Sequence, residues 1–175
     1  MYTGDPITLS HRATPNQLDE MIPHVAYEVA AVEASAKRFV GCDDRFMLEA
    51  FLLHVRLLRE FLWGMVEDSP RYADSSLYAE DYFPDVLIWR DRKGPLRSSL
   101  AATKDPIDKQ LAHVCRERID PSFTIDLEAQ VSELQTELLA QWQHFLRCLG
   151  NDPRTERLRA AHQEWRRKLR IEGAT

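Results

Sequence analysis

The sequence predicts an all-α protein, an antiparallel four-helix bundle with an additional C-terminal helix. The first observation is periodicity, because apolar residues recur at spacings of three and four along several long stretches. The second is the presence of helix-start signals, because capping residues and prolines stand at the beginnings of these stretches. The third is that no stretch alternates apolar and polar residues with the period of two typical of strands.

Length and composition fit one globular domain over residues 1–175, with a core bundle at about 14–150 and a basic C-terminal helix at about 153–171. Of 175 residues, 44% are hydrophobic and 29% are charged, an ordinary globular balance. The formal net charge of −5 does not favour nucleic acid over the whole surface, so RNA binding would need a local basic patch.

Charge interrupts every long apolar stretch, so no membrane span is expected. Residues 1–9 lack the apolar core of a signal peptide. The three cysteines, Cys42, Cys115 and Cys148, form no Cys-x-x-Cys pair, which argues against a zinc knuckle or a redox pair. Free cysteines suit a reducing compartment, so we expect a cytoplasmic protein without a cofactor.

The first helix is predicted from Thr14, its cap, to about Phe39, with Gly41 ending it. Pro23 should kink this helix or split off its first turns. A second helix is predicted from Asp43 or Asp44 to about Met65. Its apolar face is wide enough to indicate burial on more than one side, as in the central helix of a bundle.

Residues 66–102 form a connection that is rich in aromatic residues and in breaker signals such as Phe83-Pro84 and Gly94-Pro95. We expect this loop to be ordered, with short helical turns near 76–82 and 95–102. A third main helix should begin at Asp105-Pro106 and stop at Pro121. A fourth is predicted over about 124–149.

Four polar residues fall among apolar neighbours on the second and third main helices. His54 points along the apolar face, where a core histidine bonded to neighbouring groups is the simplest interpretation. Arg56 is four residues before Glu60, a spacing that favours an intrahelical ion pair. Lys109 and His113 are one turn apart and form either a solvated stripe or a cationic, titratable pair facing Arg56 or the acidic loop residues Glu80, Asp81 and Asp85.

Three blocks of this chain resemble small HEPN-like bacterial proteins, and together they cover roughly residues 49–118. The blocks are Glu49 to Leu62, Tyr78 to Phe83, and Ile107 to Val114 followed by Arg118. The resemblance implies a HEPN-type helical bundle, often dimeric, in a superfamily that includes RNases of toxin–antitoxin and phage-defence systems beside many non-catalytic members.

The chain departs from the pattern of active HEPN RNases, in which four to six residues lie between an arginine and a following histidine. Only Arg157…His162 meets that spacing, in the basic C-terminal helix, and chance alone would produce about two such pairs. Leu57 follows Arg56 where asparagine is more usual, and Asp108-Lys109 replaces Asn-Lys.

Two functions follow as hypotheses. In the first, the chain is a non-catalytic module that forms a homodimer or holds a protein partner. In the second, it is a metal-independent RNase, since His54 and His113 supply acid and base while Arg56 and Lys109 supply positive charge near a phosphate. Candidates for binding contacts are Glu60, Glu80, Asp81 and Arg118. A metal site drawn from His54, His113, Glu60 and Asp81 lacks a metal-binding pair on any one helix, so none is expected.

Overall fold

The computed structural model describes residues 12–42, 45–64, 77–103, 107 and 127–171. Every regular element within these ranges is helical, which confirms the predicted all-α class. In chain order, the elements are α1 (Pro15–Cys42), α2 (Arg45–Trp63), the short 3-10 helix η1 (Ala79–Tyr82), α3 (Val86–Arg92), α4 (Ser98–Ala102), α6 (Leu127–Leu149) and α7 (Pro153–Lys168).

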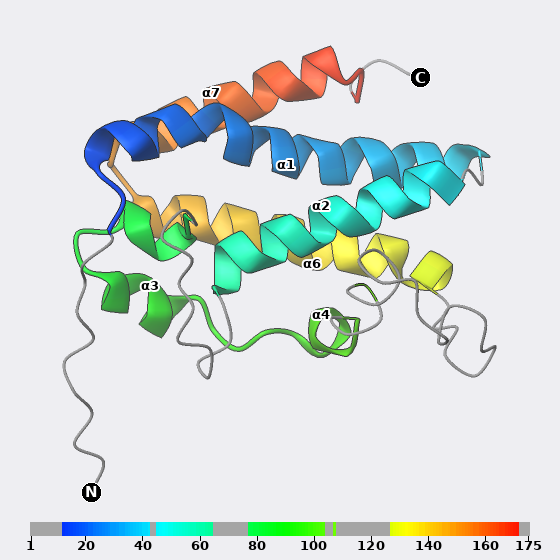
Figure 1. Cartoon of the computed structure of the whole chain (residues 1–175), viewed down its shortest axis with the longest axis horizontal. Coiled ribbons are helices and arrows are strands. Elements are labelled where there is room, and N and C mark those ends of the chain that lie inside the picture. Colours follow the sequence, from blue (N-terminus) through cyan, green and yellow to red (C-terminus); the bar gives the residue numbers. More distant parts are fainter. Residues whose placement is uncertain (1–11, 43–44, 65–76, 104–106, 108–126, 172–175) are drawn as a thin grey trace, which may run out of the picture.

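Helix α1 lies between α7 on one side and α2 with α6 on the other (Figure 1). Both α2 and α6 run back against the direction of α1, and α7 then returns parallel to it (Figure 1). The short helices α3 and α4 pack against α6 and leave α7 on the opposite side of the molecule. The C-terminal helix is therefore a full layer of the structure.

The start of α1 has the predicted capping arrangement. The Gln17 side chain accepts a hydrogen bond from the Thr14 backbone at 2.8 Å, and the Thr14 hydroxyl accepts one from the Gln17 backbone at 3.3 Å. The predicted split at Pro23 is wrong, because α1 continues through this residue and through Gly41 to Cys42. The Pro23 ring is exposed, and buried Ile22 and Val25 on either side hold the helix against its neighbours.

The core lies where α6 meets α1, α2 and the connecting segment. Trp142, Phe145 and Leu138 of α6 are fully buried. Aromatic rings of the connecting segment pack on α6 at this point. Phe83, the residue after η1, stacks on Trp89 of α3 at 5.7 Å, and Trp89 is edge-on to Phe145 at 5.4 Å. The predicted aromatic-rich connection is thus ordered within residues 77–103, with helical turns close to both expected positions.

Two segments of the chain differ from the prediction or lie outside the described residues. Helix α3 was not predicted, although Asp85 caps it by accepting a hydrogen bond from the Leu87 backbone at 2.9 Å. The third main helix predicted over 105–120 falls outside the described residues, apart from Ile107, which is helical and buried. Within the described part of the chain, none of the helices is apolar over a length that would cross a bilayer.

Candidate functional site

His54 lies on the side of α2 that faces α1, and its ring is held by two groups from that helix. Its Nδ1 is 2.7 Å from Oε2 of Glu28, and its ring meets Tyr27 edge-on with centroids 5.6 Å apart. The side chain is 14% exposed. A carboxylate beside Nδ1 orients the imidazole ring, because it accepts a hydrogen bond from that nitrogen. The expected neighbouring group for His54 is therefore Glu28.

The other members of the predicted polar set are only partly placed. Arg56 and Glu60 are half-buried on α2. Their ion pair stays a prediction. Lys109, His113 and Arg118 lie outside the described residues, so their convergence with His54 also stays a prediction.

The two acidic loop residues make close contacts within the connecting segment. Glu80 is 7% exposed and receives two hydrogen bonds from the Arg90 guanidinium of α3, at 2.8 and 2.7 Å. Asp81 accepts a hydrogen bond from the Tyr78 backbone at 2.9 Å at the start of η1. Burial raises the pKa of the Asp81 carboxyl above its ordinary value. These contacts fix the η1–α3 turn.

A buried polar cluster between α1 and α7 was not predicted. His162 Nε2 is 3.0 Å from Oε2 of Glu33, and Arg166 Nε is 3.5 Å from the same oxygen. Glu33 and His162 are 9% and 6% exposed. Glu33 sits next to Val32 in the sequence, beside the apolar stripe of α1. A carboxylate in that position is the signal that could have revealed a buried partner.

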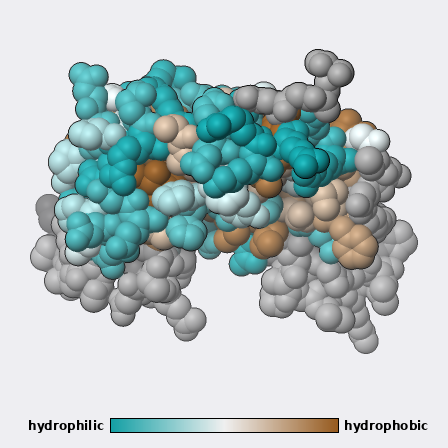
Figure 2. Space-filling model, turned by 90° about the horizontal axis from the view of Figure 1, so that it is seen from above, coloured by the Kyte–Doolittle hydropathy of each residue, from teal (hydrophilic) through white to brown (hydrophobic). Residues whose placement is uncertain are grey.

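The Arg157…His162 pair does not form an open site. Arg157 is 2.9 Å from Asp19 of α1, while His162 is buried against Glu33. Other cations of α7 also meet carboxylates, in the pairs Arg154–Asp19, Arg159–Glu156 and Lys168–Glu164. Figure 2 looks onto this side of the molecule and shows a largely hydrophilic surface. Most of the cations that α7 carries are therefore paired with carboxylates.

An exposed apolar stripe follows α2. Phe46, Leu53 and Leu57 are 79%, 43% and 39% exposed, and their spacings of seven and four place them on one face. The sequence predicted a wide buried face on α2, and Phe51, Leu58 and Leu62 are indeed buried. The burial expected for Phe46 and Leu57 is wrong, because α1 and α6 cover the other sides of α2.

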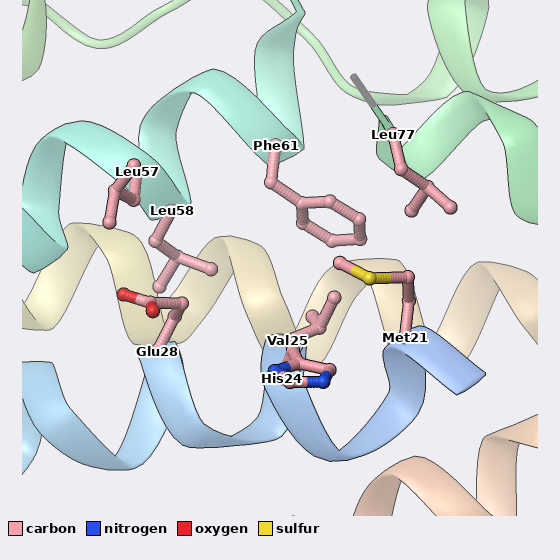
Figure 3. A pocket seen from close by; sticks show the side chains of 8 residues that line it. All are labelled: Met21, His24, Val25, Glu28, Leu57, Leu58, Phe61 and Leu77. Atoms are coloured by element: carbon pink, nitrogen blue, oxygen red, sulfur yellow. The ribbon is translucent and has the colours of Figure 1, made fainter. Parts of the chain in front are cut away.

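A pocket of about 220 Å³ lies beside this stripe, between α2 and α1 (Figure 3). Phe61 and Leu58 of α2 face Met21 and Val25 of α1 across it, and Leu77 closes one end (Figure 3). The complete lining is Met21, His24, Val25, Glu28, Leu57, Leu58, Phe61 and Leu77. Because most of the side chains that line the pocket are apolar, the pocket is suited to binding an apolar group.

Among the described residues, no group of three or more His, Cys, Asp and Glu side chains is arranged to hold a metal ion. Comparison with known proteins gives no relative from which to argue: no family model matches the chain, and neither curated proteins nor solved structures yield a significant match.

Proposed function

We propose that this chain is a non-catalytic cytoplasmic interaction module of the HEPN-like kind, which binds a protein through the exposed face of α2 and forms a homodimer. In this proposal, residues 105–120 supply the remaining helix of a four-helix bundle. The observation that carries the proposal is the apolar stripe of Phe46, Leu53 and Leu57 next to an apolar pocket. Contiguous exposed apolar surface with a polar rim is typical of a protein-binding face.

The contacts of the polar residues support binding over catalysis. His162 and Glu33 are buried together, and Glu80 is held by Arg90. Arg157 of α7 contacts Asp19 of α1, and Lys168 contacts Glu164 of its own helix. In the described part of the chain, cations that are paired with carboxylates in this way are less available to contact the phosphates of RNA.

The proposal is tested by the mass of the purified chain across a dilution series, measured by sedimentation equilibrium. We expect a dimer at the highest concentrations and a monomer on dilution. Leu57→Glu should shift the protein to the monomer, because a buried unpaired charge opposes association. Leu87→Glu is the matched control, since Leu87 is 54% exposed on the distant helix α3. A wild-type chain that stays monomeric at all concentrations would rule out the proposal.

The alternative function is that of a metal-independent RNase. The contact between His54 and Glu28 supports this alternative. A histidine oriented by a carboxylate is the usual form of a general base, and Glu28 plays that part at 2.7 Å. RNA cleavage in the presence of a metal chelator tests this alternative. His54→Ala and His113→Ala should abolish cleavage, while His24→Ala, at an exposed position on α1, should not. Cleavage at the wild-type rate by both variants, or none by the wild type, would reject it.

A further inference from the structure

We infer that the α2 face binds α2 of a second copy of this chain, antiparallel and about a two-fold axis near Leu53, with Phe46 of each copy filling the other's pocket. This inference rests on the proposed function and adds the partner surface and its register. Three features of α2 support this inference. They are the spacing along the helix between Phe46, called the knob below, and the pocket; the size of the pocket; and the charges beside the apolar stripe.

The knob and the pocket lie at matching distances on opposite sides of Leu53. Phe46 is seven residues before Leu53, about 10.5 Å at 1.5 Å per residue. The α2 residues that line the pocket, Leu57 to Phe61, lie four to eight residues after it, about 6 to 12 Å away. A two-fold axis at Leu53 therefore brings Phe46 of one copy over the pocket of the other. A parallel pair would place Phe46 against Phe46.

The pocket is suited to one aromatic side chain. Its volume of about 220 Å³ is below the roughly 300–1,000 Å³ of most small-molecule sites. Met21 and Phe61 offer a flexible thioether and a ring edge, both favourable contacts for a second ring (Figure 3). Phe46 is 79% exposed, the highest exposure among the large apolar side chains of the described residues. The same chain thus presents a largely exposed aromatic ring and an apolar pocket that could receive one.

The charges beside the stripe favour the antiparallel direction. Glu49 and Arg56 are seven residues apart, so they lie on the same flank of α2 within about 20° of each other. Glu49 is four residues before Leu53 and Arg56 three after it. In the antiparallel pair, Arg56 of one copy lies beside Glu49 of the other, and the contact occurs twice. A parallel pair about a two-fold axis would place this flank of the two copies on opposite sides of the contact, so that Glu49 and Arg56 would not meet.

Cross-linking tests the register in a chain whose three cysteines are replaced by serine. Leu53→Cys should give a covalent dimer under mild oxidation, because the residue meets its own copy at the axis. Phe46→Cys should not, since its two copies are about 21 Å apart along the helix pair. Leu87→Cys, exposed on α3, controls for random collision. Mixing Phe46→Cys with Glu60→Cys should restore cross-linking, because residue 60 lies opposite residue 46.

Charge reversal provides the second test, read from the dimer Kd and from a melting curve that confirms folding. Glu49→Arg and Arg56→Glu should each weaken the dimer by roughly tenfold, since each turns two attractions into repulsions. The double variant should return to near the wild-type Kd. A stable dimer without cross-linking at residue 53, or without rescue, overturns this register but leaves self-association standing. A monomeric wild type overturns both proposals.

Discussion

Arg170 holds an unusual backbone conformation directly after α7, with φ at 56°. The Ile171 amide reaches back to the Arg166 carbonyl at 3.0 Å, which is the bonding of a helix that ends through a left-handed residue. Lys37 and Arg38 of α1 then donate to the carbonyls of Ile171 and Leu169. The cations of α1 thus satisfy acceptors that the end of α7 leaves open. Glycine is the residue that this position favours.

Replacing that arginine should therefore stabilise the protein. Arg170→Gly removes the steric cost of a Cβ at positive φ and should raise the free energy of unfolding by about 0.5–1 kcal/mol. The matched variant is Gly150→Ala, because Gly150 ends α6 at φ 60° and should lose about as much. Urea denaturation of both variants measures the two shifts. Equal values for Arg170→Gly and wild type would show that the contacts around residue 170 outweigh the backbone cost.

The contribution of the His162–Glu33 pair to stability depends on the burial of both side chains. Removing His162 leaves the Glu33 carboxylate under α7 with only the longer contact to Arg166. Breaking a hydrogen bond to a buried charge costs more than removing both groups, since the remaining charge loses water without compensation.

His162→Leu should accordingly lower the free energy of unfolding by about 2 kcal/mol. Adding Glu33→Leu should recover much of that loss, because two apolar side chains then replace a charge and its partner. The measurement is a double-mutant cycle by urea denaturation at pH 7. If the two single effects simply add, the two residues do not act as a pair.

At the scale of elements, ion pairs hold the start of α7 against α1. Arg154 and Arg157 both contact Asp19, each at 2.9 Å. The hydrogen bond from Arg157 is the largest of the effects that hold the pKa of Asp19 below its ordinary value of 3.8. Desolvation comes next and opposes it, while the hydrogen bond from Arg154 and the charges of both arginines add to the lowering. Because the pKa is lower in the folded state, the pairing stabilises the protein above pH 3.8 and loses its effect as the pH falls below that.

Asp19→Asn should therefore lower the Tm at pH 7, and the difference from wild type should shrink as the pH falls from 7 toward 3. Added salt should reduce the same difference, since Asp19 is 37% exposed and its charge is open to screening. Thermal melts at several pH values and at two salt concentrations measure both effects. A Tm difference that stays constant with pH would show that Asp19 acts through its shape or its helix position alone.

The sequence indicated helices well where one physical signal dominated. Thr14 and Gln17 form the capping box that their spacing predicted, and Asp152-Pro153 begins α7. The split expected at Pro23 does not occur because packing along the rest of α1 offsets the local cost of a proline, about 3 kcal/mol, while the kink given as the alternative stays a prediction. Helix α3 was missed because its seven residues are too few to show a period.

The candidate site was harder to predict because it depends on contacts between distant residues. Periodicity placed His54 on an apolar face, but nothing in the local sequence links it to Glu28, which is 26 residues earlier. The exposed stripe on α2 was equally hidden, because Phe46 and Leu57 have the same spacing as buried residues. Whether an apolar residue is covered is decided by the position of α1 and α6, which is a property of the whole molecule.

The position of α7 in the fold also depends on contacts across the whole molecule. Its apolar stripe is thin and its sequence strongly basic, so the sequence predicted an additional helix outside the bundle. In the structure Leu158 is fully buried and Thr155 is 1% exposed. The Trp165 indole donates to the Pro23 carbonyl at 3.0 Å and its ring meets Tyr27 edge-on. Helix α7 is thus packed into the same core as α1, and we expect the two helices to unfold together.

A chain that ends at residue 151 should not unfold cooperatively. Removing α7 exposes the surface that Leu158 covers and leaves the Glu33 carboxylate without His162, two effects that together reach about 5 kcal/mol, the low end of the total stability of a domain. Calorimetry of the truncated chain should show a broad transition, and a dye that binds apolar surface should fluoresce. Arg159→Ala in the full chain, at an exposed position of α7, should melt as the wild type does. A truncated chain with a sharp transition near the wild-type Tm would instead make α7 an independent appendage, because only a helix outside the core can be removed without loss.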